Sequence, residues 1–151
     1  MSYTNDSGRR EIIDTASAAV EPLGRALAAL TEVYEQLDEP SADRLEELVF
    51  KPLQSGYGLL RRTLTEFAGR YGIDAPRVQS AHVGLPEDVR TALEHVADAA
   101  DEADGRLADL QDTLLPVEVG DPELRAGLAR TRSTIAPVPE RCEALIRTFG
   151  R

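Results

Sequence analysis

Residues 89–114 read VRTALEHVADAADEADGRLADLQDTL, and an apolar or small residue recurs at every third or fourth position. Alternating steps of three and four match the repeat of an α-helix and place these side chains along one stripe. The same spacing recurs from Ile13 to Leu37 and from Leu124 to Phe149. Stripes of this kind pack knobs into holes, so the sequence predicts long helices that associate side by side. The stripe of residues 89–114 consists of Val89, Leu93, Val96, Ala100, Ala103, Leu107, Leu110 and Leu114.

A further helix is expected over residues 41–72, where the apolar spacing is looser and favours steps of four. Such a repeat drifts in the opposite sense to a heptad, so this helix is expected to be straighter or locally unwound. The four segments together predict an all-α fold: an antiparallel up-down-up-down four-helix bundle with kinked or broken helices near mid-length. The helices are expected at about residues 7–39, 41–72, 86–116 and 121–150, within one domain that covers residues 1–151.

Residues at the segment boundaries support these limits. Ser41 is expected to cap the N-terminus of the second helix, and Asp121, followed by Pro122, that of the fourth. Gly72 and Gly150 are placed to end the second and fourth helices with the left-handed backbone that glycine adopts easily.

The three connections differ in length. Those near residues 38–41 and 116–120 are short, which predicts antiparallel neighbours. The middle one, about residues 73–84, is longer than a hairpin needs and contains apolar residues. It is therefore expected to pack across one end of the bundle.

Helix-breaking and small residues fall near the middle of all four segments rather than at their ends. Within a helix, proline removes one backbone hydrogen bond and clashes with the carbonyl four residues earlier. An alternative architecture breaks the fourth helix at Pro137 and contains five helices. The prolines are Pro22, Pro52, Pro137 and Pro139, and the carbonyls that they free are those of Ala18, Leu48, Ser133 and Ile135.

Two arrangements are open at this middle level. Either the helices approach one another closely around bends, or a cavity opens between them that would hold a small apolar molecule. The residues expected to line such a pocket are Leu23, Leu27, Leu53, Gly56, Tyr57, Leu60, Ala100, Ala103 and Ile135.

The composition argues against several classes of partner. The formal net charge of −10 repels the phosphates of nucleic acids and of anionic membranes. A single cysteine, a polar N-terminus and the lack of a long apolar run predict a cytoplasmic protein. Only one of the 17 basic residues is a lysine, and alanine is abundant, which indicates a GC-rich microbial genome.

The charge is unevenly divided among the four segments. Residues 5–39 carry −5 and residues 85–115 carry −7, whereas residues 41–72 carry +1 and residues 121–151 carry +2. In an up-down-up-down bundle each acidic helix would lie between less acidic or basic ones. The pattern is therefore expected to be neutralised within the molecule, without an external partner.

No residue pattern predicts catalysis or metal binding. Cys142 lies on an apolar stripe and is expected to be a small buried side chain rather than a nucleophile. His82 and His95 lack the Glu-x-x-His pattern of metal sites in bundles. The acids of residues 98–104 lack the spacing of a calcium loop. The chain is thus predicted not to be an enzyme and to hold no cofactor and no metal.

The run Ser55-Gly56-Tyr57-Gly58 is followed by Arg61 and Arg62, which are the candidate contacts for an anion. A phosphate loop needs a preceding strand, which this segment lacks. The run is therefore expected to be a glycine-weakened stretch of helix.

These observations favour a non-catalytic protein–protein interaction or self-assembly module of a cytoplasmic microbial protein, whose partner is a second copy or another protein. The alternative is a small-molecule-binding or sensory helical bundle with its pocket at mid-length. Apolar residues outside the stripes, which would widen a buried face or meet a partner, are Leu48, Phe50, Leu59, Leu115 and Ile146.

Overall fold

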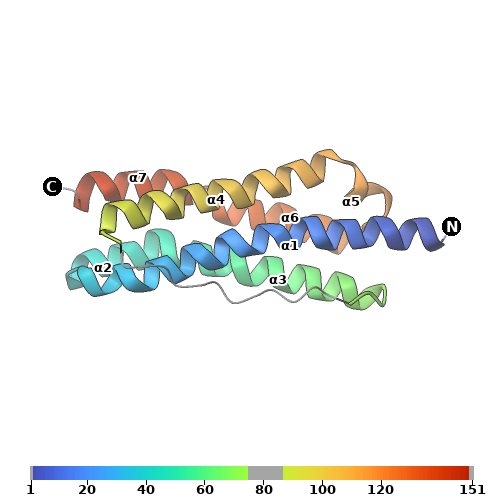
Figure 1. Ribbon diagram of the computed structural model, residues 1–151, viewed down its shortest axis with the longest axis horizontal. Helices are drawn as coiled ribbons and strands as arrows, with labels where there is room; N and C mark the ends of the chain where they lie inside the picture. Colours follow the sequence, from blue (N-terminus) through green and yellow to red (C-terminus); the bar gives the residue numbers. More distant parts are fainter. Residues whose placement is uncertain (1, 75–86, 150–151) are drawn as a thin grey trace.

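The computed structural model describes residues 2–74 and 87–149, and every regular element in this part of the chain is a helix (Figure 1). The prediction of an all-α fold is confirmed. None of the described helices combines the length and the apolar character that a membrane-spanning helix needs. The elements are α1 (Ser2–Val33), the 3-10 turn η1 (Tyr34–Gln36), α2 (Glu39–Leu45), the π-helix η2 (Glu46–Phe50), α3 (Lys51–Arg70), α4 (Val89–Asp112), α5 (Leu115–Glu118), α6 (Pro122–Ile135) and α7 (Val138–Phe149).

Helix α1 makes its most extensive contact with α4 and runs antiparallel to it. Arg25, in the second half of α1, donates a hydrogen bond to Glu102 of α4 at 3.1 Å. Beyond the end of α1, Gln36 donates to the carbonyl of Glu87, just before α4, at 2.9 Å. The end of α1 therefore lies beside the start of α4.

Helix α3 packs along α6, and these two helices are also antiparallel. Arg70 at the end of α3 pairs with Asp121 at the start of α6. Helix α3 is antiparallel to α1 as well. Arg9 lies near the start of α1 and Tyr71 directly follows the end of α3, and the Arg9 guanidinium lies 3.9 Å from the centre of the Tyr71 ring. Helices α3 and α4 both run opposite to α1 and hence run parallel to each other.

The predicted up-down-up-down order is therefore wrong. The chain runs up, down, down and up, so Asp74 and Glu87 lie at opposite ends of the elongated molecule (Figure 1). The expected packing of the connection at about residues 73–84 across one end of the bundle concerns mainly residues 75–86, which lie outside the described residues. Apolar spacing is identical for a helix and its reversed neighbour, so it carries no information on direction.

Two predicted helix limits are confirmed and one is wrong. The Asp121 carboxylate accepts a hydrogen bond from the Leu124 N–H at 2.8 Å and caps α6. Gly72 has a φ of 64°, the left-handed backbone expected after α3. Ser41 is not a cap: its N–H donates to Asp38, which begins the helix earlier. Gly150 lies outside the described residues.

The prolines act differently on their helices. Helix α1 continues through Pro22 without interruption. The π-helix η2 precedes Pro52, and Pro137 lies in the break between α6 and α7. The Leu48 carbonyl, which Pro52 deprives of its usual helical donor, accepts a hydrogen bond from Arg141 Nη1 at 3.0 Å. A side chain of α7 thus replaces the missing backbone donor.

Replacing Arg141 by methionine is expected to lower the free energy of unfolding by about 1 kcal/mol. Methionine keeps much of the apolar stem but removes the donor, so the Leu48 carbonyl loses its partner. The control is Arg147→Met, at an exposed position of the same helix. Urea unfolding of both variants measures the difference, and equal stability of the two would refute this role for Arg141.

Candidate functional site

Most of the residues predicted to line a mid-level pocket lie in one hydrophobic core. Leu27 and Tyr57 are half-buried, and the remaining seven are buried. Gly56 of α3 approaches Ile135 of α6 so closely that an added Cβ would overlap the isoleucine side chain. At this contact the structure favours the closely packed alternative over a cavity. The seven buried residues are Leu23, Leu53, Gly56, Leu60, Ala100, Ala103 and Ile135.

The two candidate anion contacts are exposed side chains of α3. The Arg61 guanidinium lies 5.3 Å from the centre of the Tyr57 ring, a cation–π arrangement on the helix surface. Residues 55–58 lie inside α3, so their N–H groups are used within the helix and do not form a cradle for phosphate. An anion site at Arg61 and Arg62 gains no support from a second element.

Cys142 and His95 lie in different surroundings. Cys142 is fully buried, and burial, followed by the charge of Glu143, raises the pKa of its thiol to about 12. A neutral buried thiol is a poor nucleophile. His95 Nδ1 lies 2.9 Å from Glu87 on the exposed start of α4. Among the described residues no three His, Cys, Asp or Glu side chains converge as metal ligands. His82 lies outside the described residues.

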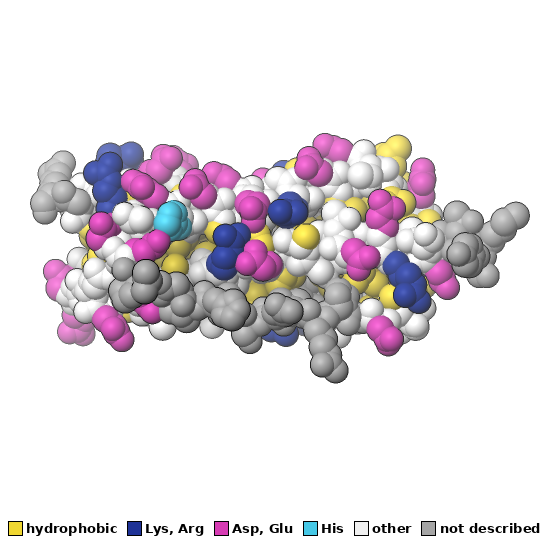
Figure 2. Space-filling view, viewed as in Figure 1, with side chains coloured by type: hydrophobic (Ala, Val, Ile, Leu, Met, Phe, Trp, Pro, Cys, Tyr) yellow, Lys and Arg dark blue, Asp and Glu magenta, His cyan; other side chains and the backbone are white. Residues whose placement is uncertain are grey.

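The arrangement of the helices separates the charges of the molecule. Because α1 lies along α4, the two acidic segments, of −5 and −7, are neighbours. The expectation that each acidic helix lies between less acidic ones is therefore wrong. We call the exposed surface of α1 and α4 the acidic half; Figure 2 shows acidic side chains along its length, outnumbering the basic ones.

Few cations compensate the charge of the acidic half. Arg25 bridges Glu21 and Glu102 at 2.9 and 3.1 Å, across the α1–α4 boundary. Partial burial and then the neighbouring carboxylates of Asp98 and Asp104 raise the pKa of Asp101. A raised carboxyl pKa reports crowding of like charge. Arg106 of α4 and Arg132 of α6 also pair with acids of this surface, Glu102 and Asp104, but the acids of residues 5–39 and 85–115 outnumber the cations, so the surface keeps a net negative charge.

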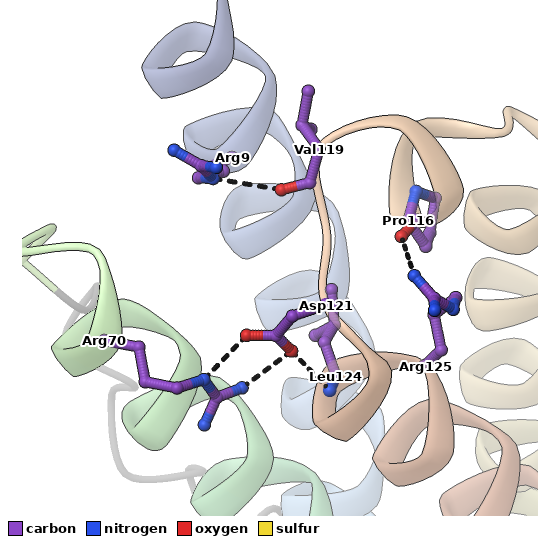
Figure 3. Close-up of polar contacts among 7 residues, drawn as sticks. All are labelled: Arg9, Arg70, Pro116, Val119, Asp121, Leu124 and Arg125. Carbon is purple, nitrogen blue, oxygen red and sulfur yellow. Dashed lines mark hydrogen bonds and ion pairs between the residues drawn. The ribbon is translucent and has the colours of Figure 1, made fainter. Parts of the chain in front are cut away.

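One end of the molecule is fixed by arginines (Figure 3). Arg9 of α1 donates to the Val119 carbonyl at 3.0 Å. Arg125 of α6 donates to the Pro116 carbonyl of α5 at 3.3 Å. Both bonds hold the turn that contains α5 against the long helices.

The strongest polar contact at this end joins α3 to α6. Arg70 binds both carboxylate oxygens of Asp121, at 2.6 and 2.9 Å, while Asp121 also caps α6 (Figure 3). Burial alone would raise the pKa of Asp121, but the hydrogen bonds from Arg70 and the Leu124 N–H outweigh it and the pKa is lowered. The carboxylate is thus held ionised in a nearly buried position.

The structure corrects the expected position of one stripe residue. Leu114 was expected to continue the apolar stripe of residues 89–114, but α4 ends at Asp112 and Leu114 is 57% exposed. Val117 of α5, three residues further along the chain, is 63% exposed. These are the only large hydrophobic side chains among the described residues that are this open to solvent. Nothing in the spacing distinguished Leu114 from the buried leucines before it.

Comparisons of the chain with models of protein families, with curated proteins and with solved structures found no match. The function is therefore inferred from the residues of this chain alone.

Proposed function

We propose that this protein is a non-catalytic binding module that recognises a cationic protein segment through its acidic half. The observation that carries the proposal is the packing of α1 along α4, which joins segments of −5 and −7 on one side. Charge of one sign on an extended surface speeds encounter with an oppositely charged partner and disfavours partners of like charge.

The same charge disfavours other classes of partner. Phosphate backbones and anionic lipids are repelled by a surface of this sign. Two acidic halves also repel each other, so self-assembly through this surface is disfavoured. The apolar residues expected to widen a buried face or meet a partner are all half-buried, and four of them pack against the core: Leu48, Phe50, Leu115 and Ile146.

A small apolar ligand is the less favoured alternative. It needs open volume at the middle level, where Gly56 and Ile135 are instead in close contact. That contact supports packing as the role of the small residues there.

The proposal is tested with a fluorescein-labelled 18-residue amphipathic peptide of leucine and lysine as the probe. In one variant Asp98, Asp101 and Asp109 of α4 become asparagine, which removes three charges from the acidic half. We expect the dissociation constant, measured by fluorescence anisotropy, to rise about tenfold and its salt dependence to weaken.

The matched control neutralises three exposed acids of the other helices, Asp43→Asn, Glu66→Gln and Glu140→Gln. Because the net charge changes equally, this variant separates the position of the charge from its amount. We expect its dissociation constant to stay within about twofold of the unmodified protein. Equal weakening by the two variants would show non-specific attraction and would refute the proposal.

A further inference from the structure

We infer that Leu114 and Val117 form the apolar anchor of the binding surface, and that the partner is an amphipathic segment carrying apolar side chains beside lysines or arginines. This inference rests on the proposed function, because it names the place and the chemistry of that recognition. The region that contains both residues, at 109–118, is called the apex below.

The first observation is exposure without an internal role. Leu114 and Val117 are 57% and 63% exposed, while the other large apolar side chains of the described chain are buried or half-buried. The Val117 N–H donates to the Leu114 carbonyl, so the two residues are neighbours, and neighbouring exposed apolar residues mark contact sites more often than scattered ones do. Two side chains alone make a small contact, which suits weak and reversible binding.

The second observation is the backbone of Leu114, which has a φ of 68°. Leucine is disfavoured in this left-handed region, where glycine is the usual residue after a helix. Its side chain is largely exposed, so little packing within the chain offsets the strain. Strained residues cluster at binding sites, so the backbone of Leu114 supports a contact with a partner at this position.

The apex is held rigid, which suits an anchor. The Leu114 carbonyl accepts hydrogen bonds from the N–H groups of Val117 and Glu118, at 3.0 and 2.9 Å. Thr113 Oγ1 donates to the Leu110 carbonyl at 2.7 Å. Together with the bond from Arg125 to Pro116, these contacts fix the backbone that carries the two apolar side chains before binding. A preordered site loses little entropy when a partner binds.

Charge decides which occupant fits the apex. Asp109, Asp112 and Glu118 are exposed and flank the two apolar residues in sequence, and none forms an ion pair with another described residue. The nearby Arg9 and Arg125 donate instead to backbone carbonyls of this turn. A second copy would bring the same three acids against those of the first, and an anionic membrane would be repelled. A cationic, apolar protein segment meets both the charge and the exposed hydrophobic surface.

The decisive variant is Leu114→Gly. Glycine adopts the left-handed backbone without strain, so we expect the variant to raise the Tm by about 2–4 °C. It also removes the proposed anchor, so we expect the dissociation constant for the leucine–lysine peptide to rise about tenfold. Higher stability with weaker binding separates loss of the anchor from loss of the fold.

Val117→Thr provides a second variant, because it replaces an apolar methyl with a hydroxyl at similar size. We expect it to weaken peptide binding severalfold while the Tm changes little. The matched control is Leu59→Thr, at a half-buried surface position of α3 away from the apex, with binding expected to be unchanged. Backbone amide NMR shifts on adding the peptide are expected to be largest at residues 109–119.

The outcomes separate this inference from the proposed function. If the peptide binds, and neutralising the acids of α4 weakens it while Leu114→Gly and Val117→Thr do not, the acidic half stands and the apex is refuted. If the peptide does not bind at all, both fail. A mass above 16.4 kDa in sedimentation that Leu114→Gly abolishes would identify a second copy as the occupant and overturn the inference. Binding of the apex to anionic vesicles would overturn it as well.

Discussion

Replacing Asp121 by alanine is expected to lower the free energy of unfolding by about 3 kcal/mol. Two contributions are lost together: the cap on the Leu124 N–H, and the two-point contact with Arg70 between α3 and α6. A helix cap is worth about 1 kcal/mol and a hydrogen bond between charged groups about 1.5–3 kcal/mol. The loss of stability is limited because the Arg70 side chain is 33% exposed and can be hydrated once it has no partner. The Asp121 side chain, which the substitution removes, is only 11% exposed.

Asp121→Asn separates the two contributions. Asparagine caps a helix as well as aspartate does but has no charge, so about half of the loss is expected to return. Urea unfolding at neutral pH measures all three proteins. An Asp121→Ala variant as stable as the unmodified protein would show that the contact with Arg70 contributes nothing measurable.

The pH dependence provides an independent check. The pKa of Asp121 is lowered in the folded protein, so its charge stabilises the fold fully above the ordinary carboxyl pKa of about 4. That contribution is lost as the pH falls from about 4 toward the lower folded pKa. The carboxylate is fully ionised from about pH 5 to about pH 7, so the stability difference between the unmodified protein and Asp121→Asn is expected to be constant there. Below about pH 5 the difference is expected to shrink. A difference that grows at low pH would contradict this assignment.

The second large effect is expected at Gly56, where alanine should lower the free energy of unfolding by about 2 kcal/mol. An added methyl group would overlap the buried side chain of Ile135, which has little room to move. The gain in helix propensity from glycine to alanine, about 1 kcal/mol, offsets only part of that cost.

Gly58→Ala is the matched control, two residues further along the same helix. Its added Cβ would meet no atom within 4 Å, so only the gain in helix propensity remains. We expect it to raise stability by about 0.5–1 kcal/mol, opposite in sign to Gly56→Ala. Thermal unfolding of both variants tests the pair. A stabilised Gly56→Ala would mean that α3 and α6 leave space at mid-length, and would restore the pocket alternative.

Local chemistry predicted some limits and failed at others for a definable reason. Asp121 and Gly72 were predicted because a capping aspartate and a left-handed glycine act within a few residues. The prediction that Ser41 caps the second helix is wrong because Asp38 competes for the same N-terminus. Both residue types can cap a helix, so geometry decides between them. The prediction that Leu114 belongs to the apolar stripe is wrong because α4 ends at Asp112. Leu114 therefore lies outside the helix and is exposed, although its spacing in the sequence continues the stripe.

The candidate surface could be predicted only in part. The charge of each segment is a property of the residues, so the acidity of residues 5–39 and 85–115 is evident from the chain. Their union in one acidic half depends on α1 lying beside α4, a contact between residues more than 50 positions apart, such as Gln36 and Glu87. The apex likewise needed the backbone angle and exposure of Leu114 to be recognised.

By itself the amino-acid order determined that the chain forms helices, roughly where they lie and which side chains they bury, because a 3.6-residue period and the caps are local properties. Only the tertiary structure decided which helices are neighbours, in which direction they run and where their charges meet. The physical reason is that an apolar stripe fits the stripe of any other helix in either direction. The choice among neighbours rests instead on close contacts such as Gly56 with Ile135 and on polar pairs such as Arg70 with Asp121.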